Sequence, residues 1–247
     1  MILGIIPSRY ASSRFPGKPL ADIAGMTMIE RVYRQAIQSK SLAKVIVATD
    51  DERIFNHVKD FGGNVVMTSV SHPSGTDRCY EALQKTEGRF KYVINIQGDE
   101  PFIDPGQIDI LAGMLKDDTT ELATLLMPVK TSDLLFNPAN IKVVVNKKME
   151  AMYFSRQAIP FFRDAEPAEW HKHFTYYSHV GMYAYRCDIL EKITALEPSA
   201  LEKAEMLEQL RWLENGFTIR CGITTIKSYS VDEPEDVSGV LKLKGIN

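Results

Sequence analysis

The chain has 247 residues, of which 45% are hydrophobic and 25% are charged, with a net charge of −3. A chain of this size can bury a real core, and its slightly acidic balance argues against a nucleic-acid binder with a basic face. We expect no membrane span, because no apolar run approaches the roughly 20 residues required, and we expect no signal peptide. Three widely spaced cysteines without a CxxC motif indicate buried thiols in a cytoplasmic protein.

The first element is a short apolar run over residues 3–6, which Pro7 ends. Such a run is typical of a parallel strand that is buried on both faces. The following segment, 8–18, contains no acidic residue, and its polar and cationic residues are Ser8, Arg9, Ser12, Ser13, Arg14, Gly17 and Lys18. A loop at the carboxyl end of a first strand lies where open α/β sheets bind ligands, and these side chains suit a polyphosphate.

This basic segment matches neither of the two common phosphate-binding fingerprints. Pro19 follows Lys18 at the position where a Walker loop has the Ser or Thr that holds magnesium, and the chain contains no GxGxxG motif. A basic surface loop without a ligand therefore remains the alternative interpretation.

Strands and helices then alternate up to residue 96. Apolar runs predict strands at 45–49, 65–67 and 92–96, and helical spacing predicts helices at about 27–37, 54–61 and from 76 onward. Thr27-x-x-Glu30 has the pattern of a capping box. This βαβ alternation predicts an α/β fold with a mostly parallel sheet and right-handed crossovers.

The strand at 92–96 runs into the sequence QGDEP, at 97–101. Its carboxylate should lie at the same edge of the sheet as the basic segment. Asp99 and the cationic side chains together indicate a nucleoside triphosphate with Mg²⁺, because hard cations prefer oxygen ligands and often share them with phosphates. The alternative is a polar turn before the next helix, but Asp104 already supplies the cap that Pro105 follows.

The second half of the chain has a different pattern. Strands predicted at 122–129, 141–145, 151–155 and 177–185 resemble antiparallel ribbons, and the aromatic stretch 157–176 indicates an insertion or a subunit contact. Helical spacing after Ser199-x-x-Glu202 predicts one helix that ends at Gly216, followed by a strand over 217–226. We find no repeat or linker, and so predict a single domain, 1–247, with a smaller elaboration within 122–186.

Several motifs together resemble the CMP-Kdo synthetase family, the 3-deoxy-manno-octulosonate cytidylyltransferases. These motifs run in order over nearly the whole chain and are IIPSRYASSRFPGKPL (5–20), SGTDR (74–78), QGDEP (97–101), YFSR (153–156), SHVGMYAYR (178–186), EMLEQLR (205–211) and VDEPEDV (231–237). The resemblance implies a Rossmann-like nucleotidyltransferase sheet with a smaller dimerisation subdomain. It also implies a cytoplasmic homodimer that uses CTP and Mg²⁺ to convert the acid sugar Kdo to CMP-Kdo, with release of pyrophosphate, for lipopolysaccharide biosynthesis.

The resemblance also assigns roles to individual residues. Arg9, Arg14 and Lys18 would hold the CTP phosphates, Asp99 and Asp232 would bind Mg²⁺, and Arg9, Lys18, Asp99 and Asp232 would form the catalytic set. Further nucleotide contacts would come from Ser12, Ser74, Gly75, Arg78 and Gln97. The sugar would be surrounded by Gln97, Arg156, Arg163, His179, Tyr183, Glu208 and Gln209.

One segment departs from the family pattern, because Phe161-Phe162-Arg163 stands where a Trp-Asp-Arg sequence is expected. For two other residues a structural interpretation competes. Asp232-x-x-Glu235 is also the pattern of a helix cap, and His179 could be a buried histidine, a sugar contact or a general base.

Other functions remain open at this stage. The acid sugar could be 8-amino-Kdo or a sialic acid, since such enzymes share the CTP half of the site. A glycosyltransferase would use a similar sheet, but no DxD motif follows the fourth strand. A non-catalytic nucleotide-binding regulator would be expected to have lost some of the charged residues, and all of them are present.

Overall fold

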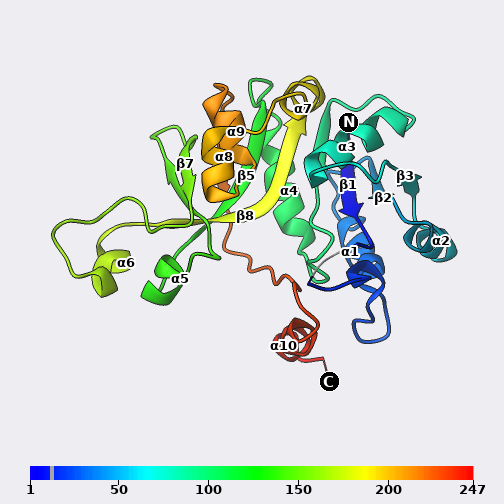
Figure 1. Cartoon of the computed structure of the whole chain (residues 1–247), viewed down its shortest axis with the longest axis horizontal. Helices are drawn as coiled ribbons and strands as arrows, with labels where there is room; N and C mark the ends of the chain where they lie inside the picture. The colour runs from blue at the N-terminus through cyan, green and yellow to red at the C-terminus, as the bar shows by residue number, and fades with distance from the viewer. Residues whose placement is uncertain (12–13, 247) are drawn as a thin grey trace. The chain divides into compact units, whose positions relative to one another are not determined.

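The computed structural model describes residues 1–11 and 14–246 (Figure 1). The chain divides into two compact units. The first comprises residues 1–113 together with the chain from residue 226 onward, and the second comprises residues 114–225. The second unit is therefore inserted into the sequence of the first.

The first unit is built on four parallel strands, β1 (Ile2–Ser8), β2 (Lys44–Thr49), β3 (Val65–Met67) and β4 (Tyr92–Asn95). They lie in the order β3-β2-β1-β4, with Gly4 of β1 opposite Val45 of β2 and Ile94 of β4. Because β1 and β4 are parallel neighbours, the segments that leave their carboxyl ends emerge at the same edge of the sheet. The α/β class and the mostly parallel sheet predicted from the sequence are confirmed.

The helices of the first unit are η1 (Lys18–Leu20), α1 (Met28–Ala36), α2 (Glu52–Asp60), α3 (Gly75–Lys85), α4 (Pro105–Met114) and α10 (Asp236–Leu243). Side chains cap several of them: Thr27 accepts from Glu30 N, Asp51 from Arg53 N, and Ser74 from Asp77 N. At Thr27 only this half of the predicted capping box is present, because the Glu30 carboxylate pairs with Arg34. Apolar residues on α1, such as Ile29 and Val32, are fully buried.

The last helix begins later than the sequence pattern predicts. Its N-cap is Glu235, whose side chain makes no capping hydrogen bond, so the interpretation of Asp232 as the cap is wrong. Instead the Asp236 carboxylate accepts from the backbone N–H groups of Asp232 and Glu233, at 2.8 and 2.9 Å. This turn leaves the Asp232 carboxylate available to other groups.

The second unit contains β5 (Leu122–Pro128), β6 (Lys142–Val145), β7 (Ala151–Ser155), β8 (Tyr177–Arg186) and β9 (Ile219–Ile223). Strand β5 pairs with β8 in an antiparallel and with β9 in a parallel arrangement, and β6 pairs with β7 and β8 in antiparallel arrangements. The predicted ribbons are thus present. The 122–186 range lies within this unit, and its role in dimerisation stays a prediction.

Short helices connect these strands: α5 (Ser132–Phe136), η2 (Pro167–Glu169), α6 (Trp170–His173), α7 (Cys187–Thr194), α8 (Ala200–Glu205) and α9 (Gln209–Glu214). The single helix predicted to run from Ser199 to Gly216 is wrong, because Met206 adopts a left-handed conformation (φ 53°) and ends α8. Figure 1 shows α5 and α6 side by side. No helix in the described part of the chain is long and apolar enough to cross a membrane.

Candidate active site

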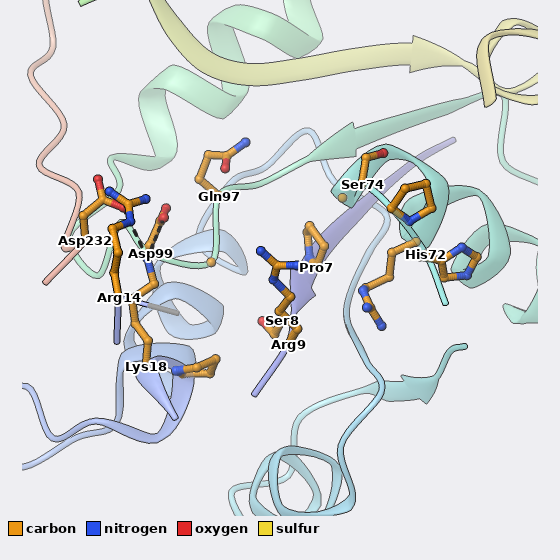
Figure 2. Close-up of a pocket in the computed structure, with 15 residues that line it drawn as sticks. Pro7, Ser8, Arg9, Arg14, Lys18, His72, Ser74, Gln97, Asp99 and Asp232 are labelled. Carbon is orange, nitrogen blue, oxygen red and sulfur yellow. Dashed lines mark hydrogen bonds and ion pairs between the residues drawn. The ribbon is translucent and has the colours of Figure 1, made fainter. Parts of the chain in front are cut away.

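A cavity of about 300 Å³ lies in the first unit, at the ends of β1 and β4 (Figure 2). Among the residues that line it are nine of those singled out from the sequence, namely Arg9, Arg14, Lys18, Ser74, Gly75, Arg78, Gln97, Asp99 and Asp232. Ser12, also predicted to contact the nucleotide, lies outside the described residues. The structure therefore brings together a set that spans almost the whole length of the chain.

Cations and carboxylates meet at one end of this cavity (Figure 2). The Lys18 ammonium lies 2.9 Å from Asp99 Oδ2 and 3.7 Å from Asp232 Oδ1, and it donates to the Val231 carbonyl at 2.9 Å. Arg14 Nη2 lies 2.9 Å from Asp232 Oδ1. We call Arg14, Lys18, Asp99 and Asp232 the charged end of the cavity.

Local structure holds the charged end in place. Gly17 adopts a left-handed conformation (φ 72°) just before η1, so the chain turns sharply and Lys18 begins that helix. Val231 N donates to Asp99 O at 2.9 Å, which ties the C-terminal segment to the loop after β4. Val231 is fully buried and packs in a cluster with Ile23, Met28 and Val240. This packing fixes the neighbouring Asp232.

The charged end has the donor set expected of a magnesium site that relies on its substrate. Two carboxylates from distant segments converge on one cation, the Lys18 ammonium. Residues 1–11 and 14–246 contain no group of three or more His, Cys, Asp or Glu side chains suited to a metal. Mg²⁺ is commonly held by one or two carboxylates, with phosphates and water completing the octahedron. Asp99 and Asp232 fit such an ion.

Glu100, which follows Asp99 in the sequence, differs from Asp99 in its burial. Glu100 is 9% exposed, and burial together with the nearby Asp99 charge raises the pKa of Glu100 to about 7. Asp99 lines the cavity and pairs with Lys18. Of the two acidic residues in QGDEP, Asp99 is therefore the one placed for ligand binding.

The loop after β4 approaches β1 closely at Gly98. A Cβ added there would lie 2.9 Å from the Pro7 carbonyl oxygen and 3.1 Å from Ser8 Oγ. Ser8 lines the cavity, is 5% exposed, and its hydroxyl has no hydrogen-bond partner among the described residues. Because residue 98 is glycine, the loop after β4 can pack against Pro7 and Ser8 at the wall of the cavity. The buried Ser8 hydroxyl is available there for a ligand.

Figure 2 shows His72 and Ser74 at the opposite end of the cavity, and Pro73, Gly75 and Arg78 also line the cavity. Ser74 caps α3, and its hydroxyl also donates to Asp77 Oδ2 at 2.6 Å. The Arg78 guanidinium is 4% exposed, pairs with Asp50 at 2.7 Å and donates to Thr68 Oγ1 at 2.6 Å. Its charge is thus neutralised within the protein.

His72 lines the cavity, although no sequence pattern indicated it as a site residue. Its Nε2 atom bonds the Glu81 carboxylate, which also accepts from Ser69 N at 2.7 Å and pairs with Lys85 at 2.6 Å. Burial raises the pKa of Glu81, but the bonds from Lys85, Ser69 N and His72 outweigh it and lower that pKa to about 2. His72 directly precedes the SGTDR motif, but its pairing with Glu81 depends on the fold.

The residues predicted to bind the sugar, apart from Gln97, belong to the second unit. The His179 and Tyr183 rings lie 5.1 Å apart, and both Tyr183 and Gln209 are buried. The remaining three form other contacts: Arg156 Nε donates to Glu205 O at 2.8 Å, Glu208 accepts from Arg211 at 2.9 Å, and Arg163, highly exposed, pairs with its neighbour Asp164. Of this set, the structure thus places the His179 and Tyr183 rings next to each other.

His179 should make the stability of the protein depend on pH. Burial lowers the pKa of His179 to about 4, and its Nε2 lies 3.0 Å from Thr124 Oγ1. The unfolded chain, with a histidine pKa near 6.5, binds the proton more readily. The contribution of neutral His179 to the free energy of unfolding is therefore complete above about pH 6.5 and is lost as pH falls toward 4. At pH 5 the free energy of unfolding should be lower by about 2 kcal/mol.

Urea unfolding at pH 7.5 and pH 5 measures this effect. The His179→Gln variant should lose less free energy of unfolding between the two pH values than the native protein. His173→Gln, at an exposed position, is the control and should behave like the native protein. Equal losses in the native and His179→Gln proteins would contradict the assignment.

Comparisons with known proteins agree with this geometry. The sequence profile of the cytidylyltransferase family matches residues 3–223. The chain is 55% identical to the 3-deoxy-manno-octulosonate cytidylyltransferase of Cytophaga hutchinsonii, over 96% of this chain and 94% of that relative. It is also 55% identical to the protein of the same name from Parabacteroides distasonis, over 97% of this chain and 96% of that relative.

Solved structures give the same result. A structure of CMP:2-keto-3-deoxy-manno-octonic acid synthetase complexed with CTP has a TM-score of 0.90 and 42% identity, covering 99% of this chain and 98% of that one. A putative glucose-1-phosphate thymidylyltransferase from Bacillus anthracis, at 16% identity and a TM-score of 0.66, shares the fold. The resemblance seen in the sequence is confirmed: the chain belongs to the 3-deoxy-manno-octulosonate cytidylyltransferase family of cytidylyltransferases.

Proposed function

We propose that this protein transfers CMP from CTP to 3-deoxy-D-manno-octulosonate (Kdo), giving CMP-Kdo and pyrophosphate. The observation that carries the proposal is the charged end of the cavity, where Arg14 and Lys18 meet Asp99 and Asp232. The family of the chain gives the substrates, and this arrangement offers cations for phosphates and carboxylates for a metal within one cavity.

In the proposed reaction, the anomeric hydroxyl of Kdo attacks the α-phosphorus of CTP. A phosphorus–oxygen bond forms to the sugar, the bond from the α-phosphorus to the bridging oxygen breaks, and pyrophosphate leaves. Such a step depends on alignment and neutralisation of charge. Arg9, Arg14 and Lys18 would hold the β- and γ-phosphates and stabilise the charge that develops on pyrophosphate. The hydroxyl proton passes to solvent, and we assign no side chain as general base.

Asp99 and Asp232 would hold Mg²⁺. When bound, the ion supplies neutralisation of the phosphate charge and lowers the pKa of a coordinated hydroxyl. In this structure Asp99 pairs with Lys18, and Asp232 pairs with Arg14. If the two carboxylates held the ion instead, the ammonium and guanidinium groups would be available to the phosphates.

The sugar would contact residues of the second unit together with Gln97. Half-buried His179 and buried Tyr183 offer an aromatic and polar surface, and Gln209 and Glu208 offer hydrogen-bonding groups suited to the hydroxyls of the sugar. Arg156 and Arg163 are the candidates for its carboxylate. Burial lowers the pKa of His179 to about 4, so its ring is neutral near pH 7.

We further propose a cytoplasmic homodimer that supplies the activated sugar for lipopolysaccharide. All three cysteines, each among the described residues, are free. An aromatic face surrounds buried Trp170: the Phe136 and Phe161 rings lie 5.5 and 4.9 Å from it, and both are exposed, Phe161 by 73%. Contiguous exposed rings are typical of subunit contacts.

Light scattering should give a dimer mass for the native protein and a monomer mass for Phe161→Glu.

Release of pyrophosphate from CTP, measured against a panel of acid sugars, tests the proposed function. Kdo should support turnover well above that seen with 8-amino-Kdo or sialic acid. A preference for another acid sugar would change the assigned sugar substrate but not the assigned reaction, the transfer of CMP from CTP. Absence of pyrophosphate release with every sugar of the panel would overturn the proposal.

Replacement of Asp232 by serine separates metal binding from a structural role. Asp232 does not cap α10, so Asp232→Ser should leave the thermal midpoint nearly unchanged while turnover falls by roughly 100-fold or more. Glu235→Ser, an exposed acidic residue three positions later, is the matched control and should keep near-native turnover. If Asp232→Ser were as active as the control, Asp232 would not be a ligand.

A further inference from the structure

The two ends of the cavity differ in the groups that they offer to a bound nucleotide. The charged end holds two cations and two carboxylates, and under the proposed function the carboxylates would hold Mg²⁺ and leave Arg14 and Lys18 for the phosphates. At the opposite end the Arg78 charge is neutralised by Asp50, and the first turn of α3 contains the Asp77 carboxylate, which accepts from the Ser74 hydroxyl. A negative charge in the first turn of a helix makes its N-terminus less suited to another anion. Under the proposed function, the phosphates therefore lie at the charged end and the base lies near His72.

The end near His72 also has the shape that a flat base requires. Gly75 has no side chain, and a Cβ added there would lie 3.4 Å from Pro7 Cγ. Both Pro7 and Pro73 line the same cavity. Apolar ring edges with a glycine between them leave room for a planar ring, while polar groups at the rim select its hydrogen-bonding edge.

Glu81 determines which nitrogen of His72 carries the proton. Lys85 and Ser69 N hold the Glu81 carboxylate, and their bonds with that from His72 keep it ionised at neutral pH. An ionised carboxylate only accepts hydrogen bonds, so the Nε2 atom that contacts it must donate. In neutral His72 the other nitrogen, Nδ1, is then an acceptor.

We propose that His72, held by Glu81, selects cytosine over uracil at this site. An acceptor at Nδ1 can receive a hydrogen bond from the exocyclic amino group of cytosine. Uracil presents a carbonyl oxygen at the corresponding position, and two acceptors facing each other repel. The inference rests on the proposed function, since it specifies how the base of the same nucleotide is recognised; Glu81 acts as a positioning residue through His72.

The test is the ratio of the dissociation constants for UTP and CTP, measured by calorimetry with Mg²⁺ and without sugar. His72→Gln keeps a donor for Glu81 but removes the Nδ1 acceptor. Glu81→Gln can donate to Nε2, which allows Nδ1 to become a donor. In both variants the preference for CTP should fall by about 10-fold. Glu87→Gln makes the same change at an exposed position just after α3 and should keep the native ratio.

A merely structural role for these residues would weaken the binding of both nucleotides equally and leave the ratio unchanged. The ratio of the two dissociation constants is also independent of the folded fraction of a preparation. If His72→Gln does not fold, His72→Ala takes its place. A native ratio in either the His72 or the Glu81 variant overturns the inference. Native protein that binds CTP and UTP equally also overturns it, whereas native protein that binds no CTP overturns the proposed function instead.

Discussion

Replacing Lys18 with alanine should lower kcat/KM for CTP by roughly 100- to 1000-fold, the loss typical when one group that stabilises transition-state charge is removed. The Lys18 ammonium is the cation that both Asp99 and Asp232 approach, and it begins η1 at the wall of the cavity. Alanine keeps the backbone of this helix but offers no charge to the phosphates. Pyrophosphate release at several CTP concentrations would measure the effect.

Stability should change far less than activity in this variant. The Lys18 side chain is 16% exposed and bonds Asp99 and the Val231 carbonyl, so its loss should cost about 1 kcal/mol and lower the thermal midpoint by a few degrees. Lys172→Ala removes an exposed lysine that pairs with Glu169 in the second unit, and should keep native turnover. Retained activity with a large fall in the midpoint would make Lys18 a structural residue.

The Asp99→Asn variant should be folded but nearly inactive, with kcat lowered by roughly 1000-fold at the Mg²⁺ concentration that saturates the native protein. Asparagine has the size of aspartate and can still accept a hydrogen bond from Lys18, but it lacks the charge that a hard cation requires. The concentration of Mg²⁺ that gives half-maximal rate should therefore rise together with the loss of kcat. A magnesium titration of pyrophosphate release measures both quantities.

Asp104→Asn is the matched control, because it makes the same change in the same loop after β4. Asp104 Oδ1 accepts from Gly106 N at 2.7 Å at the start of α4, and asparagine caps helices as well as aspartate does. The control should keep native stability and native magnesium dependence. Native rates for Asp99→Asn at saturating Mg²⁺ would refute the assignment of Asp99 as a ligand.

The first unit could be predicted in outline from the sequence, because buried parallel strands are short apolar runs with polar ends. The runs at 3–6 and 92–96 placed Lys18 and Asp99 at one edge of the sheet, and the structure brings these two side chains to 2.9 Å. The ion pair between Lys18 and Asp99 could not be predicted from the sequence, because a cation that suits a phosphate suits a carboxylate equally well.

Other features escaped prediction for physical reasons. The spacing of Asp232 and Glu235 matches a capping box, but this spacing does not determine where α10 begins. The start of the helix depends on the burial of Val231 and on the hydrogen bond from Asp232 N to the Asp236 carboxylate. One left-handed residue, Met206, divides a stretch whose apolar spacing predicts a continuous helix. The bond between His72 and Glu81 joins a loop to a helix, and such a contact has no period in the sequence.

The insertion of the second unit into the first has a consequence for synthesis on the ribosome. The chain returns to the first unit beside α4, the helix at whose end it leaves, since Gln107 Nε2 donates to the Ile226 carbonyl at 2.9 Å. Within the second unit Met114 lies against Gly222, so its two ends also meet. Because Asp232 is translated after the whole insertion, a nascent chain can form the β1–β4 sheet and still lack one carboxylate of the charged end. The nucleotide site is therefore completed only after Asp232 has been made and Val231 and Val240 have packed against Ile23 and Met28.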